Sequence, residues 1–222
     1  MAPPPGRGRR DRSAFGVYPA IVTDIVDPDD RGRVRVSLPD PAVGADGDLG
    51  IWATLCTPYA GEDQGLVIVP EVGTQVVVAF EGGDVGRAYV VGSIWTGRLP
   101  LPQAPDGTND IRLLRTRSDS RLEFDDAPAG PKISMTTHSG HQVVLDAGTS
   151  EVTITHSSGS SIRLTASGAV EITANGAVQV RAPAVAVDAP IATFSGVVSC
   201  ETLIAGQGVV SPSYTPGVGN LQ

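Results

Sequence analysis

Apolar and polar residues alternate along most of this chain in short runs, and Gly, Pro and Asp separate the runs. In residues 33–38, three aliphatic residues alternate with Arg33, Arg35 and Ser37, which predicts a strand with one buried face. Further short runs occur at 20–26, 51–57, 66–69, 74–80 and 88–95. Helical periodicity is absent, so the first part of the chain is predicted to form a small closed β-barrel, an architecture without exposed sheet edges.

A different repeat begins after Arg121. Pairs of apolar residues two positions apart recur at intervals that shorten from 11 to 7 residues. The pairs are Leu122/Phe124, Ile133/Met135, Val143/Leu145, Val152/Ile154, Ile162/Leu164, Val170/Ile172, Val178/Val180 and Val185/Val187. Each charged residue between Lys132 and Asp188 is out of phase with the neighbouring pair, which predicts short strands with one apolar and one polar face.

A single copy of this repeat has too little apolar surface to fold alone. Full burial of one aliphatic side chain contributes about 1.5–3 kcal/mol, whereas ordering the backbone costs ~1–2 kcal/mol per residue. We therefore expect three chains to wind around one axis, each supplying one strand per layer. The predicted axial core is Val143, Leu145, Val152, Ile154, Ile162, Leu164, Val170, Ile172, Val178, Val180, Val185 and Val187. The alternative is a monomeric solenoid, which usually needs a longer repeat of about 18–25 residues.

Charge narrows the possible partners. The net charge is −8, and residues 1–130 hold 19 acidic and 13 basic side chains against 5 and 3 in residues 131–222. An acidic chain is a poor general binder of nucleic acid, because that affinity comes largely from Lys and Arg. No run approaches the roughly 20 apolar residues that cross a bilayer, and the Arg-rich start lacks the apolar core of a secretion signal. We expect synthesis in the cytoplasm and a solvated N-terminal arm.

Candidate chemistry is sparse, and we expect no catalytic residue, metal or cofactor. His141 and His156 are in phase with the apolar pairs, which leaves open either a three-fold ring of imidazoles or polar packing at strand ends. The acidic cluster formed by Asp27, Asp29 and Asp30 lacks the spacing of a calcium loop, and a turn is the favoured interpretation. Cys56 and Cys200 are predicted to be small buried hydrophobic residues.

The barrel segment resembles the OB-fold domain of the tail-spike family that includes phage baseplate assembly protein V and the VgrG proteins of type VI secretion. The resemblance covers roughly residues 17–97. The motif residues that carry it are Gly32, Arg33, Val34, Trp52, Gly61, Pro70, Glu71, Gly73, Phe80, Asp84 and Gly92. Thr54 stands where the family often has Arg, and Ala88 stands where it commonly has Pro. Glu71, Asp84 and Arg87 are interpreted either as surface ion pairs or as contacts with a hub protein.

The resemblance implies an all-β fold in which an N-terminal OB-fold barrel is followed by an intertwined trimeric β-helix, or needle. The predicted parts are a flexible arm (1–16), the OB-fold domain (17–97), a linker (98–120), the needle (121–195) and a C-terminal tip segment (196–222). Spike tips of the family can bind iron through a His-x-His pair, which this sequence lacks. His138 and His141 are three residues apart and far from the C-terminus.

By the same resemblance, the chain is expected to be the homotrimeric central spike of a contractile injection machine, which is a phage tail, a tailocin or an extracellular injection system. Its implied partners are a separate baseplate hub above, a PAAR-type tip protein below and, briefly, the target membrane. The chain would be made in the cytoplasm and assembled into the baseplate of a phage tail or injection particle. The competing hypothesis is a binding module, either an OB barrel or a fibre-tip adhesin, that recognises a glycan, an oligonucleotide or a receptor. An enzyme ranks last.

Overall fold

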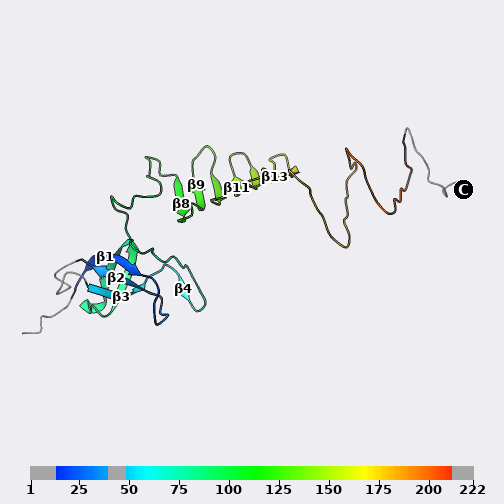
Figure 1. Cartoon of the computed structure of the whole chain (residues 1–222). Coiled ribbons are helices and arrows are strands. Elements are labelled where there is room, and N and C mark those ends of the chain that lie inside the picture. Colours follow the sequence, from blue (N-terminus) through cyan, green and yellow to red (C-terminus); the bar gives the residue numbers. More distant parts are fainter. Residues whose placement is uncertain (1–13, 40–48, 212–222) are drawn as a thin grey trace, which may run out of the picture. The chain divides into compact units, whose positions relative to one another are not determined.

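The computed structural model describes residues 14–39 and 49–211, and the all-β prediction is confirmed (Figure 1). The chain divides into two units, residues 1–175 and 176–222. The first unit contains a closed barrel and an antiparallel sheet. Most of the predicted N-terminal arm and the end of the predicted tip segment, residues 212–222, lie outside the described residues.

The barrel has five strands in the order β1-β2-β3-β7-β6, and β6 pairs with β1 to close it. The strands are β1 (Val17–Asp24), β2 (Arg33–Leu38), β3 (Leu49–Leu55), β6 (Gln75–Phe80) and β7 (Ala88–Ser93). All neighbours are antiparallel except β3 and β7, which are parallel. A short hairpin of β4 (Ala60–Gly61) and β5 (Gln64–Gly65) follows β3, and a 3-10 turn, η1 (Glu81–Gly83), precedes β7. The closed barrel predicted from the pattern is therefore present.

One predicted barrel strand does not form. Residues 66–69 follow the hairpin and belong to no strand, because the Leu66 N–H donates to the Tyr59 carbonyl at 2.9 Å. That bond holds the segment to the hairpin instead of to the barrel ladder. As a result Val67 and Ile68 are 83% and 56% exposed.

The barrel core follows from the alternation of the strands. Val34, Val36 and Leu38 of β2 are no more than 2% exposed, while their neighbours in sequence face outward. The other core members are Ala14, Ala20, Val22, Ala53, Val76, Val78, Phe80, Ala88 and Val90. Because most of these residues are alanine or valine, they fill a narrow barrel without a large aromatic cluster.

A buried carboxylate organises the loop between β1 and β2. The Asp27 side chain is 6% exposed, and its oxygens accept two hydrogen bonds from the Arg33 guanidinium, at 2.6 and 2.9 Å. They also accept the main-chain N–H groups of Asp29, Arg31 and Arg33. The Arg33 guanidinium holds the pKa of Asp27 well below its usual range, and the three N–H bonds act in the same direction. The acidic cluster is thus a turn closed by Arg33, as the favoured interpretation predicted.

Asp27→Asn should lower the melting temperature of the barrel at pH 7 by at least about 5 °C, because it removes the charge that these five donors surround. A depressed carboxyl pKa stabilises the fold above the unfolded value of about 3.9, and this stabilisation is lost as the pH falls further. The difference between wild type and variant should therefore shrink below about pH 4. Circular dichroism melts from pH 7 to pH 2 measure it.

Asp30→Asn is the matched control. Asp30 lies in the same turn with φ of 52°, a conformation that Asn tolerates, and its side chain makes none of the bonds to Arg33. The Asp30→Asn variant should have the melting temperature of the wild type. Equal melting temperatures for all three proteins would show that the Asp27–Arg33 contact does not support the barrel.

The sheet of the first unit is a meander of seven antiparallel strands in chain order. They are β8 (Ile111–Arg115), β9 (Arg121–Asp125), β10 (Lys132–Thr136), β11 (Gln142–Asp146), β12 (Glu151–Thr155), β13 (Ser161–Leu164) and β14 (Val170–Thr173). Figure 1 shows them side by side along the green and yellow part of the chain. The first strand, β8, lies within residues 98–120, the segment that the sequence predicted to be linker.

The turns explain why consecutive strands of one chain pair with each other. The turns after β8, β10, β12 and β13 share one pattern of five residues. The first residue is Thr or His, and its main-chain N–H donates to the carbonyl of the fifth residue. Asp119, Gly140, Gly159 and Gly168 occupy their fourth position with positive φ, a conformation that glycine adopts without strain. Within 111–173 the ladder is consequently made inside one chain, whereas the sequence suggested that strands of three chains would alternate.

The second unit contains no strand between residues 176 and 211. Between residues 176 and 210 no main-chain hydrogen bond joins two described residues of the chain. The apolar residues here are highly exposed, and Val178, Val180, Val185 and Val187 range from 61% to 74%. These four predicted core positions therefore lie in a segment without backbone pairing inside the described part of its own chain.

Two glycines make a close contact between turns of the sheet. A Cβ at Gly148 would lie 2.6 Å from the Gly130 Cα, whereas a Cβ at Gly130 would lie 3.6 Å from the Gly148 Cα. Gly148→Ala should therefore destabilise the sheet by about 1–3 kcal/mol, since backbone must move. Gly130→Ala, the matched control, should be close to neutral. Urea unfolding of both variants tests the contact, and equal midpoints would contradict it.

Candidate functional site: an uncovered apolar face

The register of the sheet places the predicted apolar pairs on one face, in two columns. Because paired residues of antiparallel strands point to the same side, each pair aligns with the next. One column contains Leu114, Leu122, Met135, Val143, Ile154, Ile162 and Ile172. The other contains Phe124, Ile133, Leu145, Val152, Leu164 and Val170. We call this side of the sheet the apolar face.

Nothing in the described part of the chain covers the apolar face fully. Exposure is 38% for Ile133, 46% for Ile154 and 64% for Val170, and it is highest at the last strand. Monomeric proteins rarely expose contiguous apolar patches beyond a few hundred Å², and larger patches mark interaction surfaces. Eight of the twelve predicted core residues lie on this face, namely Val143, Leu145, Val152, Ile154, Ile162, Leu164, Val170 and Ile172.

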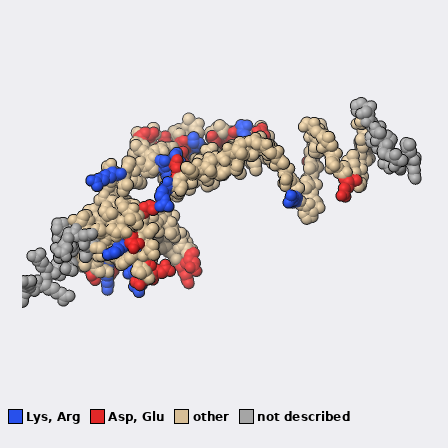
Figure 2. Space-filling model, viewed as in Figure 1, with Lys and Arg blue, Asp and Glu red and all other residues tan. Residues whose placement is uncertain are grey.

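The opposite face carries the charges of strands β9 to β14. Lys132 pairs with Asp125 across β9 and β10 at 3.4 Å, and Arg163 pairs with Glu151 and Glu171 from the two neighbouring strands. The Glu151 carboxylate, through its hydrogen bonds and then its charge, raises the pKa of Arg163 above the usual value of an arginine. Figure 2 shows the red and blue atoms of this segment gathered along one side of the sheet. The predicted division into an apolar and a polar face is present in the structure.

A groove of about 560 Å³ runs along one edge of the apolar face. Its floor includes Leu122, Met135, Val143 and Ile154, and its rim includes His141 and His156. The two imidazole rings lie side by side, with centroids 4.4 Å apart. His141 directly precedes β11 and His156 directly follows β12, and both are in phase with the apolar columns as the sequence indicated. His138 lies in the turn between β10 and β11, where its main-chain N–H donates to Ser120 Oγ at 3.3 Å.

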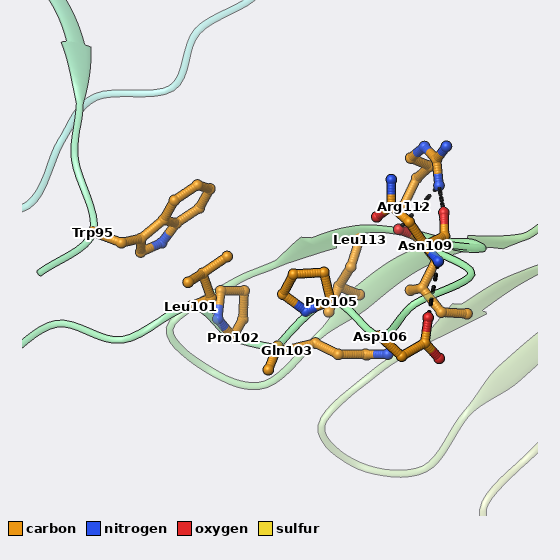
Figure 3. Close-up of a pocket in the computed structure, with 11 residues that line it drawn as sticks. Trp95, Leu101, Pro102, Gln103, Pro105, Asp106, Asn109, Arg112 and Leu113 are labelled. Atoms are coloured by element: carbon orange, nitrogen blue, oxygen red, sulfur yellow. Dashed lines mark hydrogen bonds between the residues drawn. The ribbon is translucent and has the colours of Figure 1, made fainter. Parts of the chain in front are cut away.

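A second groove, of about 480 Å³, lies where the chain leaves the barrel (Figure 3). Trp95, Leu101, Pro102 and Pro105 line it together with Leu113 of β8. Arg112 donates to the Asn109 carbonyl, and the Asp106 carboxylate accepts the N–H of Asn109. The Asn109 N–H, followed by the Thr108 hydroxyl and N–H, lowers the pKa of Asp106. These bonds fold the linker into a defined turn, a feature that its Pro and Gly content concealed.

The barrel motif residues have structural roles. Gly32 and Gly73 have φ of 67° and 89°, and the Gly73 N–H bonds the Val22 carbonyl at 2.8 Å. Trp52 lies beneath the Arg33 guanidinium, 5.7 Å from the ring centroid. Gly92 lies at a β-bulge between β6 and β7. Gly61 lies in the hairpin and Pro70 in the loop before β6. Phe80 belongs to the core, and Asp84 directly follows η1.

The charged motif residues form ion pairs within the chain. Arg87 pairs with Glu81 at 3.0 Å, and Arg117 pairs with Glu71 at 3.0 Å. Asp84 accepts the Gly86 N–H and lies 3.9 Å from Arg87. The Tyr89 hydroxyl, and then Arg87, lowers the pKa of Glu81, while the Glu81 carboxylate raises the pKa of Tyr89. The surface-pair interpretation accounts for these residues, and sequence reasoning missed Arg117 because it is 46 residues from its partner.

The prediction for both cysteines was wrong. Cys56 and Cys200 are exposed free thiols. Cys56 follows the end of β3, where the chain turns into the hairpin, and Cys200 lies in the second unit, whose described residues form no core of their own. Within the described ranges, no three His, Cys, Asp or Glu side chains gather as a metal site would require. No described helix is long and apolar enough to span a membrane.

Residues 18–95 match the family model of the type VI secretion system/phage-baseplate injector OB domain. Similar curated proteins are the type VI secretion system spike proteins VgrG3 of Vibrio cholerae and VgrG5 of Pseudomonas aeruginosa, which are 26% and 27% identical over 47% and 57% of this chain. An actin cross-linking toxin of Vibrio cholerae, VgrG1, is 24% identical over 44% of the chain. The matched segments span only 11%, 16% and 10% of these relatives.

Proposed function

The chain belongs to the VgrG-like baseplate and spike family, and we propose that it acts as the trimeric central spike of a contractile injection machine. A spike or baseplate role is the part that the injector OB domain and the named spike relatives support directly. The finer proposal is that three copies form a needle below the baseplate hub, and that this needle pierces the target envelope when the machine contracts.

The uncovered apolar face is the observation that carries the trimer. A sheet with one apolar and one charged face is stable when another layer covers the apolar side. Three identical sheets arranged around an axis would each turn this face inward and leave the charged face in water. The closed arrangement also gives each chain the same environment, as cyclic symmetry requires.

The second unit supports the same arrangement for a different reason. Its main-chain groups have no main-chain partners among the described residues over 176–210, and buried main-chain groups in proteins are almost always hydrogen-bonded. Strands supplied by two neighbouring copies would provide the missing donors and acceptors. In this proposal the upper needle consists of three self-paired sheets, and the lower needle is intertwined.

Rigidity follows from this design. A needle transmits axial force well when hydrogen-bonded strands lie across its axis in every layer and no long loop interrupts them. The turns of the sheet are short, and glycine conformations fix several of them. At about 4.8 Å per strand, the seven strands from β8 to β14 would add roughly 30 Å of stiff rod. The charged outer face keeps that rod soluble in water.

Partners and setting belong to the same proposal. A separate hub protein would bind above the barrel, where residues 66–69 expose apolar side chains. A PAAR-type protein would cap the lower end, and contact with the target membrane would be transient. Assembly at the baseplate of a phage tail, a tailocin or an extracellular injection system would follow synthesis in the cytoplasm. We propose no catalytic activity for this chain.

The runner-up is a binding module, and one observation favours it. The groove beside Trp95 presents an exposed aromatic ring next to prolines and aliphatic side chains, which is a common composition for ligand sites. The test is whether the chain binds glycans on an array, or labelled single-stranded DNA, at physiological salt. Binding that is lost in Trp95→Ala would favour this function over the spike.

The trimer is tested by Val170→Asp. Val170 is 64% exposed in a single chain, so an Asp there would cost the isolated chain little. In the proposed trimer it would place three carboxylates around one axial point without a partner, which is strongly unfavourable. Size-exclusion chromatography with light scattering should give a mass near 68.4 kDa for the wild type, three times 22.8 kDa, and loss of that species for the variant.

Thr173→Asp is the control, because Thr173 lies on the same strand but on the charged face. It should retain the trimer mass. A wild-type chain that remains at 22.8 kDa at micromolar concentration would overturn the trimer, as would a Val170→Asp chain that assembles like the control.

A further inference from the structure

The two edges of the seven-stranded sheet differ in charge. Successive turns of a meander alternate between two edges, so the turns after β8, β10 and β12 lie along one edge and those after β9, β11 and β13 along the other. We call the first the basic edge and the second the acidic edge. The basic edge has Arg115, Arg117, Arg121, Asp119 and the three histidines of the chain. The acidic edge has Asp125, Asp126, Asp146, Glu151 and one cation, Lys132.

One carboxylate on the basic edge serves two guanidinium groups. Arg115 and Arg121 lie directly opposite each other on β8 and β9, where like charges repel. An Asp119 oxygen lies 2.6 Å from a nitrogen of Arg115 and 3.0 Å from a nitrogen of Arg121, and this single charge offsets only one of the two. The Arg121 side chain is still 41% exposed. The basic edge therefore has a positive charge that no described residue of its own chain balances.

The acidic edge has the opposite imbalance. Asp125 pairs with Lys132, and Glu151 pairs with Arg163. Asp126 and Asp146 form no ion pair with another described residue, and the Asp146 carboxylate accepts only the main-chain N–H of Thr149 there. Both line a hollow of about 460 Å³ at this edge of the sheet. The acidic edge therefore keeps two negative charges without a cation.

Three-fold closure would bring these unlike edges together. In a cyclic trimer every contact is heterologous, so one edge of each sheet meets the other edge of the next copy. Copies related by rotation about the axis lie at the same level, so the start of a strand in one copy meets the end of the same strand in the next. Strand β9 begins at Arg121, ends at Asp125 and is followed by Asp126. Its basic end would thus face the acidic end of the neighbouring β9.

Two further strands repeat this arrangement. His141 directly precedes β11, which ends at Asp146, whereas β12 begins at Glu151 and is directly followed by His156. In both strands the imidazole is on the basic edge and the carboxylate is on the acidic edge. The two ends of a five-residue strand are roughly 16 Å apart, so these groups cannot meet within one chain. The repeated pattern becomes useful only between copies.

We propose that the basic edge docks against the acidic edge of a second copy of this chain, so that three identical corners close the needle. In each corner Arg121 pairs with Asp126 of the neighbouring copy, and His141 lies against Asp146 of that copy. This inference rests on the proposed trimer and adds which residues align its copies. A slip of one strand toward β10 would place Arg121 opposite Lys132 of the neighbour, which is repulsive. The corners therefore fix the level of each copy along the axis, which the apolar face alone would leave free.

The test is charge reversal across the corner in the full chain. Arg121→Asp and Asp126→Arg should each lower the association constant of the trimer by at least about tenfold, because three like-charge corners form at once. The double variant Arg121→Asp/Asp126→Arg should recover most of this loss. Rescue inside one chain is excluded, since the two residues lie on opposite edges of the sheet. Light scattering across a urea series measures the trimer, and added salt should narrow the differences between the variants.

Glu123→Arg is the matched control, because Glu123 lies in the middle of β9 on the charged face, away from both edges. It should assemble like the wild type. A trimer that tolerates both single reversals, or that the double variant fails to recover, overturns the corner contact and leaves the spike untouched. A control that weakens the trimer as much as the reversals do also overturns it. A wild-type monomer would overturn both proposals.

Cross-linking provides a second measurement that does not depend on stability. In a chain whose Cys56 and Cys200 are replaced by Ser, the variant Arg121→Cys/Asp126→Cys should give covalent trimers with a short bismaleimide. Each single-cysteine variant should remain a single chain on a denaturing gel, because the contact joins unlike edges. Linked chains from a single cysteine, or none from the double variant in a verified trimer, would contradict the proposed corner.

Discussion

The structure depends above all on the register of one antiparallel ladder. Between β9 and β14, each hairpin turn returns the chain so that the two apolar residues of one strand lie opposite the two of the next, whereas in β8 Leu114 lies opposite Leu122 and Arg112 lies opposite Phe124. A shift of one residue in any strand would move its apolar pair to the charged face. Because the register is kept through seven strands, one sheet has a continuous apolar side that the described part of its own chain leaves exposed. The separation of an apolar from a charged face, on which the proposed assembly rests, follows from this single constraint.

The main-chain hydrogen bonding differs between the segments of the chain. In residues 111–173 the turns contain residues with positive φ, and strands pair inside the chain. Beyond residue 176 the described segment has apolar residues but no ladder, so pairing must come from elsewhere if it is to be buried. The barrel is different again, because its closed sheet buries its own core and binds the loop after β1 with Asp27 and Arg33. Of the described parts, the barrel is the one that is complete as a single chain.

Much of this could be predicted from the printed residues. The alternation in residues 33–38 predicted a buried face, and Val34, Val36 and Leu38 form it. The pairing of apolar residues at intervals of two predicted the two faces of the sheet, because side chains alternate along any strand. Other features could not be predicted from local pattern. The Arg117–Glu71 ion pair and the exposure of Cys56 depend on how segments far apart in the sequence are placed. Residues 66–69 form no strand because one hydrogen bond holds them to the hairpin.

The sequence by itself therefore determined the all-β class, the presence of a barrel followed by a strand repeat, and the separation of apolar from charged residues, since period and composition carry these properties. The tertiary structure decided which strands are neighbours. The repeat over 111–173 is therefore a self-paired meander, while the described segment after it has no ladder of its own. The tertiary structure also brought His141 and His156 together and turned both Nδ1 atoms toward main-chain donors. Strand pairing and contacts between side chains depend on geometry in three dimensions, which no one-dimensional pattern contains.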